Sequence, residues 1–206
     1  MDLLTELRHR KVLAIIRADG PDRALDCVRT LVEAGITALE ISLTTPGGAD
    51  AIAKARSEYD PTILIGAGTV VTAAQADEVA AAGAGFVVTP AITRGAHRSV
   101  DLGLPLLCGA LTPTEVVAAL DLGATAVKIF PAKVYGPSYF RELRAPLPNA
   151  PLLAVGGVDA QTAPEYLAAG ALAVGVGSPL LGDAGTGGSL SDLATRAAAF
   201  RTALDV

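Results

Sequence analysis

The chain has 206 residues, of which 51% are hydrophobic, with a mean hydropathy of +0.47 and a formal net charge of -5. Its 16 lysines and arginines form no basic block and aromatic residues make up only 4%, so we expect no nucleic acid partner. No apolar run approaches the ~20 residues that a membrane-spanning helix needs, so we expect no membrane partner.

The first predicted element is a polar helix over Leu3–Arg10, which we expect to cap one end of the fold. Charged residues such as Glu6 and Arg8 interrupt any apolar segment there, so the N-terminus does not read as a signal peptide. We therefore expect a cytoplasmic protein.

From Val12 onward one pattern repeats: a short apolar run, a turn, and an Ala-rich helical stretch such as Asp22–Ala34, Ala73–Ala82 or Pro113–Leu122. Several of these stretches end in a glycine at the place expected for a helix C-cap, namely Gly35, Gly83, Gly103, Gly123 and Gly170. The predicted strands are Val12–Arg17, Ala38–Leu43, Thr62–Gly68, Phe86–Pro90, Pro105–Ala110, Ala126–Pro131, Leu152–Gly157 and Ala171–Gly177.

Alternating strands and helices predict a parallel sheet, and eight units at a spacing of ~22 residues predict closure into a barrel. The alternative is an open doubly wound sheet. Such a sheet would be expected to carry a Gly-rich dinucleotide fingerprint after its first strand, and Arg17–Pro21 is not one. We expect an α/β fold, a (β/α)₈ TIM barrel with an N-terminal capping helix, in which residues 1–206 form a single domain.

Lys128 lies inside the otherwise apolar run Ala126–Pro131. An ammonium group in low-dielectric surroundings is costly unless it is paired, which favours the neutral amine. A neutral lysine amine can form a Schiff base with a carbonyl substrate. The alternative is a lysine whose stem packs while its head group reaches water, and the strand alone does not decide. Lys133, in the following loop, reads as a solvated rim charge rather than a second nucleophile.

Glu40 is the second charged residue inside a predicted strand. Side chains alternate between the two faces of a strand. Leu39 and Ile41 would pack under the helices, so Glu40, which lies between them, should point into the barrel. Lys128 and Phe130 face the interior by the same count. Alternate strands contribute to one interior layer, so Glu40 and Lys128 can face each other. Two ionisable groups in one apolar cavity favour an active site over a buried ion pair that serves only the fold.

Glycine-rich segments end the last two strands, at Val155–Val158 and Gly175–Pro179. Barrels of this class often bind phosphate with the loops after strands seven and eight and a short helix N-terminus. Ser178 can donate its hydroxyl to an anion and cap a short helix over Pro179–Leu181. The residues expected to bind phosphate are Gly156, Gly157, Gly177 and Ser178.

Arg17 ends the first predicted strand, and Thr69 follows the third. The planar fork of an arginine suits a carboxylate, and Thr69 would add a hydroxyl donor, with Gly68 letting the ligand come close. The alternative for Arg17 is a salt bridge at the rim, for example to Asp19. Pro90, at the end of the fourth strand, would line the pocket wall.

The two cysteines and two histidines give no indication of a metal or disulfide. Cys27 and Cys108 lie in apolar segments and read as small core residues, which fits a reducing compartment. His9 and His97 lie far apart, without metal-ligand spacing around either. We therefore expect no bound metal, and we expect side chains to carry out the chemistry.

Five motifs occur in order along the chain: Leu39–Leu43 around Glu40, Gly66–Val70, Val88–Pro90, Lys128–Ala132 and Val155–Val158. With these motifs the chain resembles the class I 2-keto-3-deoxy-6-phosphogluconate and -galactonate aldolases, from about Val12 to Gly182. The resemblance implies a carbon–carbon lyase of carbohydrate metabolism, in sugar-acid catabolism of the Entner-Doudoroff type, and commonly a homotrimer. It implies that Lys128 forms the Schiff base, that Glu40 is the general acid/base and that no cofactor is needed. The implied products are pyruvate and D-glyceraldehyde 3-phosphate.

Three features favour the galactonate branch of this family. Thr44 stands where the gluconate branch typically has an arginine, so carboxylate binding would pass to Arg17. Val155 stands where that branch usually has a threonine, and the run Tyr135–Tyr139 also looks more like the galactonate branch.

Two other functions remain open from the residues themselves. One is another phosphate-binding barrel enzyme, such as a sugar-phosphate epimerase or isomerase, which needs an acid/base pair or a metal but no imine lysine. The other is a non-catalytic protein that binds a phosphometabolite, in which Glu40 and Lys128 form only a structural pair.

Overall fold

The computed structural model describes residues 2–206, which form a closed barrel of eight parallel strands in chain order. The last strand pairs back with the first, with Leu13 opposite Gly175. This confirms the predicted (β/α)₈ barrel. The strands are β1 (Val12–Ile16), β2 (Ala38–Ser42), β3 (Leu64–Gly68), β4 (Val87–Val88), β5 (Leu106–Ala110), β6 (Ala126–Ile129), β7 (Leu152–Val155) and β8 (Ala173–Val176).

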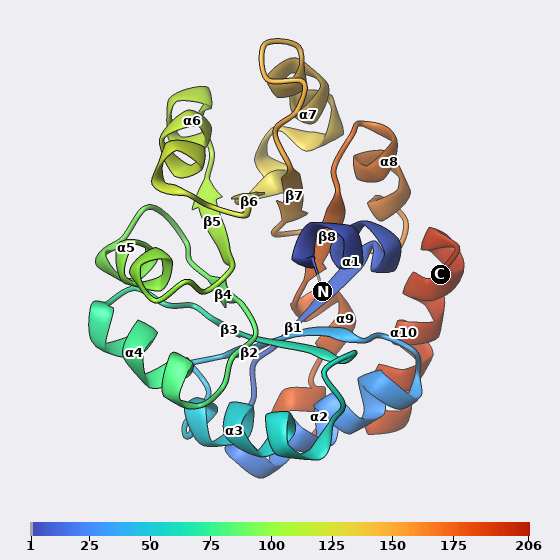
Figure 1. The fold of residues 1–206 in the computed structure, drawn as a ribbon. Coiled ribbons are helices and arrows are strands. Elements are labelled where there is room, and N and C mark those ends of the chain that lie inside the picture. Colours follow the sequence, from blue (N-terminus) through green and yellow to red (C-terminus); the bar gives the residue numbers. More distant parts are fainter. Residues whose placement is uncertain (1) are drawn as a thin grey trace.

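Helices surround the barrel on its outside (Figure 1). Capping boxes start two of them, where Thr72 and Thr112 exchange hydrogen bonds with Gln75 and Glu115. The five glycines predicted to end helices all have positive φ. None of the helices within residues 2–206 has the length and apolarity to cross a membrane. The surrounding elements are α2 (Pro21–Glu33), α3 (Gly48–Glu58), α4 (Ala73–Ala81), α5 (Arg94–Asp101), α6 (Pro113–Leu122), η1 (Ala132–Val134), α7 (Gly136–Arg144), α8 (Ala163–Ala168), α9 (Ser178–Leu181), η2 (Ala184–Thr186) and α10 (Leu190–Leu204).

The N-terminal helix α1 (Leu3–Arg10) covers the end of the barrel that faces the viewer in Figure 1. Asp2 caps this helix by accepting a hydrogen bond from the backbone N–H of Thr5. Leu3 and Leu7 are buried and join the apolar cluster inside the barrel. The predicted capping helix is therefore confirmed. The opposite end of the barrel, at the carboxyl ends of the strands, remains open for the site.

The sheet separates two apolar clusters, one inside the barrel and one beneath the helices. Ala38 and Ala126 belong to the inner cluster, whereas Leu39, Ile41 and Val127 belong to the outer one. Each fully buried Leu, Ile or Val of these clusters stabilises the fold by about 1.5–3 kcal/mol. Because Glu40 and Lys128 alternate with the outer residues, their side chains point into the barrel, as predicted.

Several strands are shorter than predicted. The structure limits β4 to Val87–Val88 instead of Phe86–Pro90, and β6 ends at Ile129 instead of Pro131. Pro90 and Pro131 have no backbone N–H, so the ladder cannot continue through them. The chain therefore leaves the sheet before these prolines, and the residues after it form the loops around the site.

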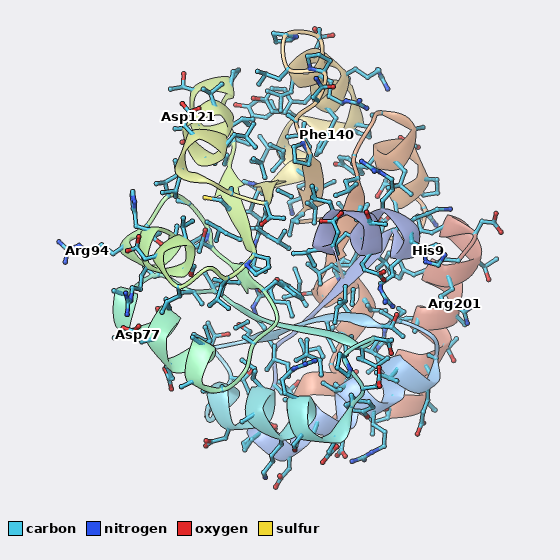
Figure 2. The ribbon with its side chains drawn as sticks, viewed as in Figure 1. His9, Asp77, Arg94, Asp121, Phe140 and Arg201 are labelled. Atoms are coloured by element: carbon cyan, nitrogen blue, oxygen red, sulfur yellow. The ribbon has the colours of Figure 1, made fainter. Side chains whose placement is uncertain are left out.

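The outer faces of the helices carry the charged side chains. Asp77, Arg94 and Asp121 are exposed and extend away from the barrel, whereas the ring of Phe140 lies between α7 and the sheet (Figure 2). Asp77 pairs with Arg98 across α4 and α5, with an N–O distance of 2.7 Å. Such exposed pairs contribute about 0–1 kcal/mol, so the two apolar clusters carry the stability.

Candidate active site

Lys128 enters the site from the middle of β6. Its neighbours in the sheet are Gly109 on β5 and Leu153 on β7, and it is only 5% exposed. The amine Nζ lies 5.2 Å from the centroid of the Phe130 ring. Within residues 2–206, the Lys128 side chain forms neither an ion pair nor a hydrogen bond. The amine is thus buried beside an aromatic ring, with no carboxylate of the described residues in ion-pair contact.

Glu40 lies on β2 and is 1% exposed, and neither carboxyl oxygen has a hydrogen-bond partner among the described residues. Burial raises the pKa of Glu40, while the positive charges of Lys128 and Arg17 act in the opposite direction. We judge that burial dominates, because the carboxylate lacks the hydrogen bonds that would stabilise its charge. A carboxyl group with a raised pKa suits the exchange of protons with a substrate near neutral pH.

Gly68 leaves the space that the Glu40 carboxyl group occupies. A Cβ atom at position 68 would lie 2.1 Å from Oε1 and 2.7 Å from Cδ of Glu40. We therefore expect Gly68→Ala to displace the carboxyl group and to lower kcat by about 10²-fold, since a shift of this kind misplaces a reacting group. Steady-state kinetics with a fluorescence unfolding curve would measure both activity and folding.

Gly20→Ala is the matched control for that substitution, because a Cβ atom at Gly20 would have no neighbour within 4 Å. The control should keep wild-type kcat. A Gly68→Ala variant with unchanged kcat would contradict the assigned position of the Glu40 carboxyl group.

The side chain of Lys128 lines a cavity of about 340 Å³ at the carboxyl ends of the strands. Glu40 is not on the cavity surface and is buried within the barrel below it. The structure brings together every other residue that the sequence suggested for the site. The lining residues are Ile15, Arg17, Thr69, Pro90, Lys128, Phe130, Lys133, Val155, Gly156, Gly157, Gly175, Gly177, Ser178 and Pro179.

A larger hollow of about 480 Å³ lies at the other end of the barrel, beside α1. Arg8 and Arg144 line it, but the Arg144 guanidinium donates to the carbonyl oxygens of Gly170 and Pro148. This hollow holds neither a buried amine nor a buried carboxyl group, so we place the chemistry in the smaller cavity at the strand ends.

Arg17 is an exposed side chain at the end of β1. It forms no ion pair within residues 2–206, so the alternative of a rim salt bridge to Asp19 is not what the structure shows. Its Nη1 atom lies 3.3 Å from the place that a Cβ of Gly177 would take. The guanidinium is therefore available to an anion in the cavity. Thr44 is exposed and bonded to Ser42, and it does not line the cavity.

The glycine loops lie where the sequence placed them, with one correction. Gly156 and Gly157 have φ values of 97° and 76°, which an L side chain rarely adopts. Ser178, predicted to cap α9, is instead its first residue, and Gly177 occupies the cap position without a side-chain bond. The predicted and observed starts of α9 therefore differ by one residue. In the observed arrangement the Ser178 hydroxyl does not cap the helix.

Phe130, Ile15 and Lys133 line the cavity but were not among the suggested site residues. The inward parity of Phe130 was a usable signal, since it matches that of Lys128. Lys133 is exposed, as predicted for a rim charge, but it also lines the cavity. The periodicity of a sequence does not predict the path of a loop, so the position of Lys133 at the cavity could not be predicted.

Known proteins resemble this chain in sequence and in structure. Residues 3–187 match the family described as KDPG and KHG aldolase. The 2-dehydro-3-deoxy-6-phosphogalactonate aldolase of Escherichia coli (strain K12) is 38% identical over 191 residues, 92% of this chain and 92% of the relative. A 2-dehydro-3-deoxy-phosphogluconate aldolase of Haemophilus influenzae is 33% identical over 168 residues, 81% of this chain and 79% of the relative.

Among solved structures, a KDPG aldolase from Legionella pneumophila has a TM-score of 0.87 and 28% identity, with coverage of 96% of this chain and 97% of that chain. In that crystal structure, pyruvate is captured at low pH as a covalent carbinolamine intermediate.

Proposed function

This chain belongs to the KDPG and KHG aldolase family, and from that premise we propose that Lys128 and Glu40 perform its class I aldol cleavage. The observation that carries this proposal is the pair of buried ionisable side chains, Glu40 and Lys128, that point into one barrel and influence each other electrostatically. Family membership as an aldolase decides against the epimerase or isomerase and against the non-catalytic binding protein.

The proposed reaction begins with imine formation. The neutral amine of Lys128 attacks the C2 ketone of a 2-keto-3-deoxy-6-phospho sugar acid, and loss of water from the carbinolamine gives a protonated imine. The positively charged nitrogen then accepts the electron pair that bond cleavage releases. The Lys128 side chain is 5% exposed and lines the cavity, so its amine is within reach of a ketone bound there.

Cleavage then needs a base at the C4 hydroxyl group. In the proposal Glu40, through a water molecule, takes the hydroxyl proton, and the C3–C4 bond breaks so that its electrons form an enamine. D-glyceraldehyde 3-phosphate leaves, the enamine takes a proton at C3, and water hydrolyses the imine to release pyruvate and the amine. General acid–base catalysis of this kind contributes about 10²–10⁴-fold.

Residues that can bind anions line the same cavity as the reacting lysine. Arg17 and Thr69 are assigned to the substrate carboxylate, since an arginine and a hydroxyl can both donate to its oxygens. The phosphate is assigned to the backbone N–H groups of Gly157 and Gly177 and to the hydroxyl of Ser178. Pro90 forms part of the wall.

We propose the galactonate epimer as the preferred substrate, because Thr44 and Val155 stand where the gluconate branch typically has an arginine and a threonine. The 38% identity to a phosphogalactonate aldolase, against 33% to a phosphogluconate aldolase, supports this choice. The experiment compares kcat/KM for the two C4 epimers in a coupled assay of pyruvate release. We expect kcat/KM for the galactonate epimer to be at least ~10-fold higher. A ratio of this size corresponds to the gain or loss of about one hydrogen bond in the transition state.

Faster cleavage of the gluconate epimer would reverse this branch assignment. Cleavage of neither epimer by the folded protein would overturn the proposed substrate class.

The assembly and location of the enzyme are proposed on family grounds. We propose a homotrimer in the cytoplasm, consistent with the two buried free cysteines, Cys27 and Cys108. Light scattering coupled to gel filtration measures the mass of the assembly, and a monomer or dimer mass would contradict the trimer.

A further inference from the structure

Lys133 is a charged residue of the active-site cavity to which the reaction above gives no task. It lies in η1, five residues after Lys128, and lines the cavity together with Gly156, Gly157 and Ser178. We propose that Lys133 binds the phosphate end of the substrate and selects phosphorylated over unphosphorylated sugar acids. This inference rests on the proposed function, because it concerns the same site.

The backbone and the stem of Lys133 both contact the first glycine loop. The backbone N–H of Lys133 donates to the carbonyl oxygen of Gly156 at 3.1 Å. A Cβ atom at Gly157 would lie 2.2 Å from Cδ, 2.8 Å from Cγ and 2.9 Å from Cβ of Lys133. The aliphatic stem therefore lies against the bare backbone of Gly157. Because Nζ is two bonds beyond Cδ, the ammonium group must lie close to the loop assigned to the phosphate.

The charges around the cavity also point to Lys133. Arg17, Lys128 and Lys133 line the cavity and no carboxylate does, although the whole chain has a net charge of -5. A phosphate monoester carries about -1.5 to -2 at neutral pH. Lys128 is consumed in the imine and Arg17 is assigned to the carboxylate. Lys133 is the lining cation that remains for the phosphate.

No other charge in the described part of the chain competes for this ammonium group. Within residues 2–206, Lys133 forms no ion pair and its side chain forms no hydrogen bond. It is also exposed, so the long side chain can follow an entering phosphate while its stem remains on Gly157.

The test uses Lys133→Met, which removes the charge but keeps a stem that can cover Gly157, and Lys133→Arg, which restores a charge. Lys54→Met is the matched control, because Lys54 is an exposed lysine on α3 that pairs with Asp22. For the phosphorylated substrate we expect Lys133→Met to raise KM ~5- to 20-fold with little change in kcat, as for loss of one charge-assisted hydrogen bond. Lys133→Arg should recover most of the loss, and Lys54→Met should match the wild type.

The same variants should differ toward inorganic phosphate and toward the unphosphorylated 2-keto-3-deoxy sugar acid. We expect the inhibition constant of inorganic phosphate to rise ~5- to 20-fold in Lys133→Met, with KM for the unphosphorylated acid unchanged. An unchanged KM for the phosphorylated substrate, or an equal rise for both acids, would overturn the role of Lys133.

A ³¹P NMR titration with inorganic phosphate needs no turnover and separates this inference from the proposed function. If the wild type cleaves no sugar acid, the proposed function fails, whereas weaker phosphate binding by Lys133→Met than by wild type still supports the assignment of Lys133. Equal binding by the two proteins overturns that assignment whether or not cleavage is observed.

Discussion

Replacement of Lys128 by methionine is expected to abolish covalent capture of pyruvate and to lower kcat by roughly 10⁴-fold or more. The physical reason is that the thioether cannot form an imine, so no electron sink stabilises the electrons of the breaking C3–C4 bond. Methionine is about as long as the buried part of the lysine stem, and Lys128 has no ion pair or hydrogen bond to lose within residues 2–206, so the barrel should still fold. Circular dichroism and pyruvate release measure the two outcomes.

Lys54→Met is again the matched control, since it removes an exposed lysine without altering the cavity. A Lys128→Met protein that is folded and retains more than about one hundredth of wild-type kcat would contradict the assigned role of the amine.

Replacement of Glu40 by glutamine should lower kcat by about 10²–10⁴-fold while the pyruvate imine still forms at Lys128. The amide has nearly the same shape as the carboxyl group but cannot take a proton from the C4 hydroxyl. Single-turnover kinetics separates the two steps, because imine formation precedes cleavage. Loss of imine formation and of cleavage to the same extent would show that Glu40 serves the structure of the site rather than proton transfer.

The Glu40→Gln variant also tests the electrostatics of the site through folding stability. Burial raises the pKa of Glu40 in the folded protein above its value in the unfolded chain. Between the two pKa values the folded protein binds the proton more tightly, so this group's contribution to stability is complete at lower pH and is lost as pH rises through the folded pKa. Glutamine does not titrate.

The free energy of unfolding should therefore fall less in Glu40→Gln than in the wild type as pH increases above the ordinary glutamate range of about 4. Urea unfolding at a series of pH values measures this difference. Parallel pH curves for the two proteins would show that the pKa of Glu40 is not raised.

The placement of Glu40 and Lys128 could be predicted because it depends on a period of two. Each residue alternates with apolar neighbours, Leu39 and Ile41 on β2 and Val127 and Ile129 on β6, and the structure places those neighbours in the outer cluster. Because side chains alternate along a strand, neighbours that pack beneath the helices leave the inside of the barrel for the charged residues. These positions left three functions open, and the resemblance carried by the five ordered motifs selected the aldolase among them.

Features that depend on contacts between loops or on strand register could not be predicted. The fit of Gly68 against Glu40 requires the pairing of Ser42 with Gly68 across β2 and β3, and no local pattern specifies that register. The contact of the Lys133 stem with Gly157 joins loops after β6 and β7 that are far apart in sequence. The first residue of α9 was misplaced by one position because Gly177 and Ser178 are both acceptable helix caps.

The most direct test of the central claim is to incubate the wild-type protein with pyruvate, reduce it with borohydride and map the modified peptide by mass spectrometry. The chain has only four lysines, Lys11, Lys54, Lys128 and Lys133, so the peptide assigns the site without ambiguity. We predict one pyruvate-derived adduct, located at Lys128 and missing from Lys128→Met. Absence of an adduct from the folded wild-type protein, or an adduct at Lys133 instead, would contradict the assignment of Lys128 as the Schiff-base lysine.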